Sequence, residues 1–84
     1  MLKLRSGVSC ADTDDGIALL DEDSGQYWNL NPTAALVLRT LLDGGSPQLA
    51  ARRLSETYEV DSDTAHEDVQ ELVTALTSTG LAER

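Results

Sequence analysis

The stretch Gly25-Gln26-Tyr27-Trp28-Asn29-Leu30-Asn31-Pro32 passes from a β-strand to an α-helix within a few residues. Trp28 and Leu30 are predicted to face one way and Tyr27 and Asn29 the other, and this period of two is typical of a half-buried strand. The Asn-Pro pair that follows is a helix start, because asparagine caps free N–H groups and proline fits the first helical position. The elements on either side of this junction decide the fold.

Two further strands are predicted before the junction. Residues 2–10 alternate between apolar and polar side chains, with Cys10 on the apolar face. We expect the polar run 11–16 to be a turn, residues 16–21 to form a second short strand, and residues 22–25 to be a hairpin loop. Short links between consecutive strands favour an antiparallel meander.

Helices are predicted after the junction. Ser46-Pro47 repeats the Asn-Pro signal and opens a second helix, while Gly44-Gly45 ends the first. We expect Thr40 of the first helix to face solvent and Tyr58 to belong to the apolar stripe of the second.

A third helix is predicted to begin after Asp61, which suits an N-cap. Its apolar stripe recurs at helical spacing: Ala65, Val69, Leu72, Val73 and Leu76. Gly80 closes the helix in a Schellman pattern that pairs Leu76 with Leu81, and residues 82–84 are expected to be a frayed tail.

Strands followed by helices indicate the α+β class, with helices packed on one face of a small antiparallel sheet. We expect one domain over residues 1–84, since a chain of this length supports one small core. The single Cys10 cannot form an internal disulfide, so a reducing, cytoplasmic location is expected. No signal peptide or membrane-spanning run is predicted.

The charge balance restricts the partners. The net charge is −9, from 15 acidic and 6 basic residues. Nucleic-acid phosphates and anionic membrane surfaces are bound through Lys and Arg, so neither is an expected partner. Two helices beside a hairpin resemble a DNA-binding winged helix, but residues 61–80 contain no Lys or Arg with which a recognition helix would approach phosphates.

The sequence gives little support for a catalytic function. Cys10 is expected to be a buried or half-buried structural residue and His66, the only histidine, an exposed one; a Cys–His dyad between them has no motif behind it. No cluster of metal-ligand residues or glycine-rich phosphate loop is present in the sequence. We therefore predict a binding protein and no enzyme, with no metal and no cofactor.

The strand over Gln26–Leu30 carries neither charge nor proline, the devices that usually protect an exposed sheet edge. If it is an edge, its free N–H and C=O groups can accept a peptide as an added strand. The alternative is that the strand is ordinary packed sheet with Trp28 in the core. The residues alone leave both possibilities open.

Five motifs together resemble the PqqD-like family of RiPP recognition elements, small modules that bind the leader of a ribosomally made precursor peptide. They are Leu19-Leu20-Asp21, Ser24-Gly25-Gln26-Tyr27-Trp28, Leu30-Asn31-Pro32-Thr33, Leu41-Leu42-Asp43-Gly44-Gly45 and Leu76…Gly80-Leu81. The resemblance extends from about Gly16 to Leu81. Within the family the chain is most similar to the leader-binding subunit of the split lasso-peptide maturation protease.

The resemblance implies a winged helix-turn-helix fold of three antiparallel strands followed by three helices. It implies that the leader adds antiparallel to the third strand, in a groove facing the third helix. The implied leader-binding residues are Gln26, Tyr27, Trp28, Asn29, Leu30, Asp68, Val69, Leu72, Val73 and Leu76. The implied partners are the precursor leader peptide, a leader peptidase and a cyclase. The alternative within the family is delivery of a redox-cofactor precursor peptide to a radical SAM enzyme.

Roles inside this set are expected to differ. Val69, Val73 and Leu76 are expected to form the groove wall, and Leu72 is expected to be core. Asp68 and its neighbour Glu71 either pair with a basic residue of the leader or form a solvated face. Trp28 remains either a core residue or part of the groove wall.

Overall fold

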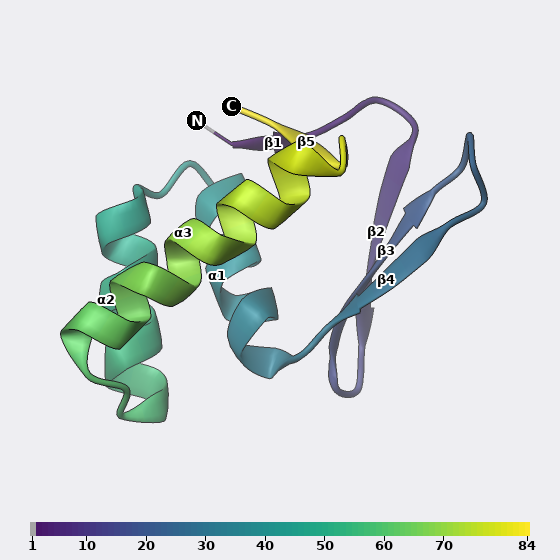
Figure 1. Ribbon diagram of the computed structural model, residues 1–84. Coiled ribbons are helices and arrows are strands. Elements are labelled where there is room, and N and C mark those ends of the chain that lie inside the picture. Colours follow the sequence, from purple (N-terminus) through teal and green to yellow (C-terminus); the bar gives the residue numbers. More distant parts are fainter. Residues whose placement is uncertain (1) are drawn as a thin grey trace.

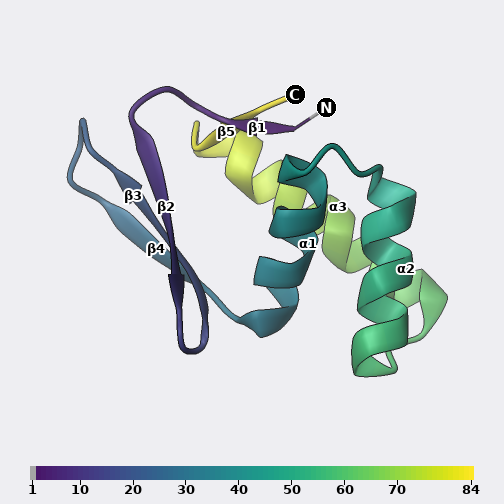
Figure 2. The ribbon, with the colours of Figure 1, turned by 180° about the vertical axis from the view of Figure 1, so that it is seen from behind.

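The computed structural model describes residues 2–84 as a three-stranded antiparallel sheet, three helices and a small two-stranded ribbon. Figures 1 and 2 show all three helices on the same side of the three-stranded sheet. The elements are β1 (Lys3–Leu4), β2 (Val8–Thr13), β3 (Gly16–Asp21), β4 (Tyr27–Leu30), α1 (Pro32–Leu42), α2 (Pro47–Tyr58), α3 (Ser62–Ser78) and β5 (Ala82–Glu83). The predicted α+β class, with sheet before helices in the winged helix-turn-helix order, is confirmed.

The helix starts follow the predicted capping chemistry. The Asn31 side-chain oxygen accepts the N–H of Ala34 at 2.9 Å, and the Ser46 hydroxyl accepts the N–H of Leu49 at 3.0 Å. The Asp61 carboxylate accepts the N–H of Asp63 at 2.9 Å. Each bond satisfies an N–H group that has no partner inside its helix, which is why each helix begins where the sequence predicts.

The end of α3 is the predicted Schellman motif. Gly80 adopts a φ of +79°, and its N–H donates to the Thr77 carbonyl at 3.2 Å. The Leu81 N–H donates to the Leu76 carbonyl at 2.9 Å. Leu76 and Leu81 are both buried, so the pairing that the sequence predicts is confirmed.

The segment after Gly80 corrects the expectation of a frayed tail. Ala82–Glu83 forms β5, which pairs antiparallel with β1 through Lys3↔Glu83 and Leu4↔Ala82. Ala82 is only 4% exposed. The tail is ordered because the Schellman turn directs it back onto the N-terminal strand, a long-range pairing that carries no local sequence signal.

The first predicted strand and turn also differ from the structure. The alternating segment 2–10 is broken by a turn at 6–7 into β1 and β2. β2 then continues through Thr13, which pairs with Gly16, so the turn is confined to residues 14–15. The polar residues of this strand end are tolerated because they lie at an exposed sheet edge.

Three single side chains are placed differently from expectation. Thr40 is 2% exposed, and its hydroxyl donates to the Leu36 carbonyl at 2.9 Å, which satisfies the buried oxygen inside the helix. Tyr58 is 42% exposed because it is the last residue of α2 and extends past the core. Cys10 is exposed, since it lies on the edge strand β2, with Leu19 of β3 opposite it.

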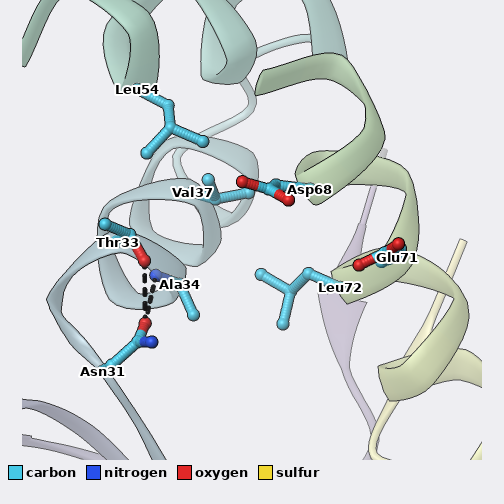
Figure 3. Close-up of a pocket in the computed structure, with 8 residues that line it drawn as sticks. All are labelled: Asn31, Thr33, Ala34, Val37, Leu54, Asp68, Glu71 and Leu72. Atoms are coloured by element: carbon cyan, nitrogen blue, oxygen red, sulfur yellow. Dashed lines mark hydrogen bonds between the residues drawn. The ribbon is translucent and has the colours of Figure 1, made fainter. Parts of the chain in front are cut away.

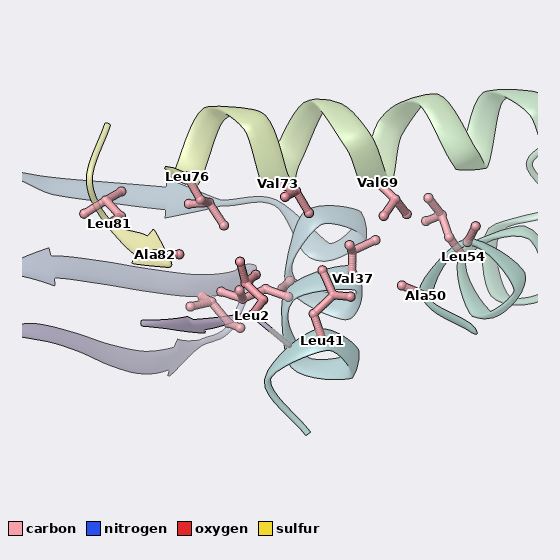
Figure 4. Packing of buried hydrophobic residues seen from close by; sticks show 14 of the residues in the cluster. Leu2, Val37, Leu41, Ala50, Leu54, Val69, Val73, Leu76, Leu81 and Ala82 are labelled. Carbon is pink, nitrogen blue, oxygen red and sulfur yellow. The ribbon is translucent and has the colours of Figure 1, made fainter. Parts of the chain in front are cut away.

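Residues from the strands β3 and β5 and from every helix form one hydrophobic cluster (Figure 4). Its largest fully buried side chains are Ile17, Leu19, Leu38, Leu54, Leu81, Val37 and Val69. Trp28, Leu30 and Leu72 pack against this cluster and remain partly exposed. Among residues 2–84, no helix has the length and apolar character needed to cross a bilayer.

Arg5 connects the sheet to the end of α3. Its Nε donates to the Gly80 carbonyl at 2.6 Å, and its guanidinium lies 2.9 Å from the Asp21 carboxylate and 3.3 Å from that of Asp23. Desolvation raises the pKa of Asp21, but hydrogen bonds from Arg5, from the backbone at Asp23 and from Ser24 outweigh it and hold this pKa below its usual value.

Arg5→Ala is expected to lower the free energy of unfolding at neutral pH. Because the folded-state pKa of Asp21 is depressed, the ion-pair part of this loss is present above the usual Asp pKa of about 3.9 and disappears as the pH falls through the lowered value. Urea unfolding at neutral pH and at a series of points below about pH 4 measures both effects.

Arg39→Ala serves as the matched control, because Arg39 pairs at 2.8 Å with the exposed Asp12. That exposed pair is expected to contribute at most about 1 kcal/mol. A difference between wild type and Arg5→Ala that stays constant down the acid series would show that Asp21 is not the group that Arg5 stabilises.

Candidate functional site

β4 is an edge strand of the three-stranded sheet. The strand order is β2-β3-β4, and β4 pairs antiparallel with β3 alone. The register runs from Ile17↔Leu30 to Leu20↔Tyr27. The other side of β4 therefore carries backbone groups that no strand of residues 2–84 pairs with, so of the two possibilities that the sequence left open the structure shows the edge.

The alternation of hydrogen-bonded and non-hydrogen-bonded residue pairs between β3 and β4 shows which backbone groups of β4 are free. The Asp21 N–H donates to the Gln26 carbonyl at 2.8 Å, and pairs in an antiparallel ladder alternate between bonded and non-bonded. Trp28 and Leu30 therefore direct their backbone groups to β3. A Cβ atom on Gly16 would clash with the Leu30 carbonyl oxygen, as expected if that carbonyl faces β3.

The N–H and C=O groups of Tyr27 and Asn29 consequently point away from β3, toward the open edge. Their side chains lie on the outer face, where Tyr27 is 61% exposed and the Asn29 amide donates to the Tyr27 hydroxyl at 3.1 Å. Two residues thus offer two donors and two acceptors at the edge. Gln26 is exposed and lies just before β4.

Trp28 and Leu30 occupy the inner face of β4. Both are half-buried and pack against the core cluster. Each thus contributes to the core and also to the surface beside the free edge. The two alternatives for Trp28, core residue or groove wall, are therefore not exclusive.

A groove of about 380 Å³ begins where β4 ends. It lies between the first turn of α1 and the middle of α3, with one α2 side chain in its wall (Figure 3). Its lining residues are Asn31, Thr33, Ala34, Val37, Leu54, Asp68, Glu71 and Leu72. Asn31 directly follows β4 and lines the groove, so the end of the strand and the groove meet at this residue.

The structure reverses the expected roles of the α3 side chains. Val69, Val73 and Leu76 are 1%, 7% and 3% exposed, and Figure 4 shows them pointing into the core. The expectation that they form an open wall is wrong, because this stripe is what holds α3 on the rest of the fold. Leu72, expected to be core, is half-buried and lines the groove.

Two carboxylates lie on the α3 side of the groove. Asp68 and Glu71 are exposed and line it together with Leu72. Neither carboxylate belongs to an ion pair among the described residues. Residues three apart on a helix are surface neighbours, so the two negative charges lie side by side.

Sequence reasoning missed the α1 and α2 side of the groove. Thr33 and Ala34 belong to the first turn of α1, and the Thr33 hydroxyl donates to the Asn31 side-chain oxygen at 2.9 Å. The Asn-Pro signal directly after β4 could have placed this turn beside the strand end. Val37 and Leu54 carry no such signal, because their position depends on how the helices pack.

Within residues 2–84, Cys10 and His66, the two residues weighed as a catalytic dyad, lie on different parts of the fold. Cys10 lies on β2, whereas His66 lines a different hollow beside α2. Desolvation, followed by the charge of Asp12, raises the pKa of the Cys10 thiol, which disfavours the reactive thiolate. Within residues 2–84 no three His, Cys, Asp or Glu side chains are grouped to hold a metal ion. An open strand edge beside a groove is suited to holding an extended chain.

The family model described as Coenzyme PQQ synthesis protein D (PqqD) matches residues 16–82. The chain belongs to the PqqD family. No match was found among curated proteins.

Solved structures are similar to this PqqD-family chain over nearly its whole length. A lasso peptide synthetase B1 complexed with the leader peptide is 47% identical, with a TM-score of 0.92 over 99% of this chain and 98% of the other. TbiB1 in complex with the TbiA(beta) leader peptide is 27% identical, with a TM-score of 0.85 over 96% and 94%. The PqqD truncation of Methylobacterium extorquens PqqCD, described as a stand-alone RiPP recognition element, is 24% identical, with a TM-score of 0.77 over 99% and 88%, and shows the shared fold.

Alanine substitutions should distinguish the groove residue Leu72 from the core residue Leu76. Leu76→Ala is expected to lower the free energy of unfolding by about 2–5 kcal/mol, because it leaves a cavity in the core. Leu72→Ala should cost about 1 kcal/mol or less, since that side chain is partly exposed already. Urea unfolding followed by circular dichroism measures both; equal losses would place Leu72 in the core after all.

Proposed function

We propose that this PqqD-family chain binds the leader of a lasso-peptide precursor as an antiparallel strand added to β4, without catalysing a reaction. The observation that carries the proposal is the open, uncharged edge of β4, where the backbone groups of Tyr27 and Asn29 have no partner strand. The leader-bound B1 relative at 47% identity supports the same reading, since it shares the fold over nearly its full length.

The expected energetics suit a reversible carrier. The four free edge groups contribute about 0.5–1.5 kcal/mol each as net hydrogen bonds. Two apolar leader side chains, seated against the half-buried side chains of Trp28 and Leu72, add about 1.5–3 kcal/mol each if fully buried. Ordering a flexible peptide takes back several kcal/mol. We predict a dissociation constant from roughly tens of nanomolar to micromolar, which needs contributions at the upper end of these ranges.

We further propose that the bound precursor is presented to a leader peptidase and then to a cyclase. The outer face of the sheet supports this step, because no helix covers it in Figures 1 and 2. The strand register places only uncharged residues on this face: Ser9, Ala11, Thr13, Ala18, Leu20, Tyr27 and Asn29. Leu20 and Tyr27 lie opposite each other and are 40% and 61% exposed, so this face offers an apolar pair to a partner protein.

Delivery of a redox-cofactor precursor to a radical enzyme remains the alternative role within the family. The description of the matching family model, Coenzyme PQQ synthesis protein D, agrees with this role, but the PqqD structure at 24% identity shares the fold alone. The greater likeness to a lasso peptide synthetase B1 favours the lasso-peptide role.

Asn29→Pro tests strand addition directly. Proline removes the outward N–H of residue 29 and places its ring at the open edge, while the bonds between β4 and β3 remain, as is usual for proline on an edge strand. Leader affinity is expected to fall about tenfold or more. Fluorescence anisotropy with the labelled leader peptide of the 47%-identical B1 relative measures it.

Asn29→Ala is the matched control, because it also removes the side-chain bond to Tyr27 but keeps the backbone N–H. Its affinity should stay within about twofold of wild type. Both variants should retain the wild-type circular dichroism spectrum. Equal affinities for the proline and alanine variants would mean that the peptide binds elsewhere.

A further inference from the structure

We propose that the groove beyond β4 holds the residues upstream of the strand-forming part of the leader, and that Asp68 and Glu71 select basic residues there. This inference rests on the proposed function and names the chemistry of the peptide at one end of the site. It commits to one occupant, an extended peptide with Lys or Arg before its β4-pairing segment.

Strand polarity determines which part of the peptide enters the groove. β4 runs from Tyr27 to Leu30. The N-terminal end of an antiparallel peptide segment therefore lies opposite Leu30, and its C-terminal end lies opposite Tyr27. Residues before the paired segment therefore extend past the end of β4 toward Asn31, which follows the strand and lines the groove. The groove is the direct continuation of the edge in the N-terminal direction of the peptide.

The shape and lining of the groove suit long side chains with a polar end. Its volume of about 380 Å³ is open to solvent, and its walls include apolar side chains from all three helices, among them Val37, Leu54 and Leu72 (Figure 3). Lys and Arg lay their aliphatic stems along such surfaces while the charged ends remain at a polar rim. Asp68 and Glu71 provide that rim.

The charged side chains that line the groove, Asp68 and Glu71, are both acidic. No Lys or Arg is among the lining residues, and α3 contains neither type. The positive end of the α1 dipole opposes a cation, but the Asn31 side-chain oxygen already accepts two hydrogen bonds at this end. Two adjacent carboxylates on one helix destabilise each other, and a basic ligand would remove this repulsion.

Three versions of one probe test the charge preference. The leader peptide of the 47%-identical B1 relative is synthesised with the residues just upstream of its strand-forming segment replaced by lysines, by alanines or by glutamates. For the wild type at low salt we expect the affinity order lysine, alanine, glutamate, with a total spread of about tenfold. The spread should shrink as salt is added.

Variants of the protein test whether the preference for basic peptides arises at the groove. Asp68→Asn combined with Glu71→Gln should reduce the spread to about threefold or less. Glu56→Gln combined with Glu67→Gln, which changes the net charge equally but lies outside the groove, should retain it. Asp68→Lys combined with Glu71→Lys should invert the order of affinities.

The outcomes separate this inference from the function on which it rests. Equal affinities of the three peptides for the wild type would overturn the basic-flank inference while leaving strand addition intact. A spread that both double variants reduce equally would show a general charge effect and would also overturn it. If none of the peptides binds the wild type, the proposed function itself fails.

Discussion

The junction between β4 and α1 is the constraint on which the rest of the structure depends. The Asn31 side-chain oxygen accepts the N–H of Ala34 and the hydroxyl of Thr33, each at 2.9 Å, so the strand ends and the helix begins within one residue. α1 then packs on the inner face of the sheet instead of extending it. β4 is left as an edge, and the strand opens directly onto the groove between α1 and α3.

Two kinds of surface result from this arrangement. The edge of β4 is uncharged and offers backbone groups, which bind extended peptides with little regard to sequence. The groove adds apolar walls and two unpaired carboxylates, which can distinguish one peptide from another. In the proposed function, affinity and selectivity would come from different residues, while the buried stripe of α3 holds that helix on the rest of the fold.

The sequence predicts those features that depend on local chemistry. The caps at Asn31, Ser46 and Asp61, the Schellman turn at Gly80 and the face alternation in β4 all follow from neighbouring residues, and the structure confirms them. The lack of charge and proline in Gln26–Leu30 can likewise be read from the sequence, whereas the position of this strand at the sheet edge is seen only in the structure.

What the sequence could not predict depends on contacts between distant segments. β5 exists because the chain end pairs with β1, and Arg5 reaches Gly80 across 75 residues of sequence. Helical periodicity placed Leu72 and Val73 in one apolar stripe but could not say how far α3 is rotated, so the buried and groove-lining positions were interchanged. Rotation of a helix is decided by the packing of its neighbours.

The central claim is that a leader peptide becomes a strand next to β4. Amide hydrogen exchange followed by NMR, with and without the leader of the 47%-identical B1 relative, tests it most directly. We expect the amides of Tyr27 and Asn29 to exchange rapidly in the free protein and to become protected on binding, while those of Trp28 and Leu30 are protected throughout. Protection that appears on β2 instead, or no change at Tyr27 and Asn29 in the saturated complex, would contradict it.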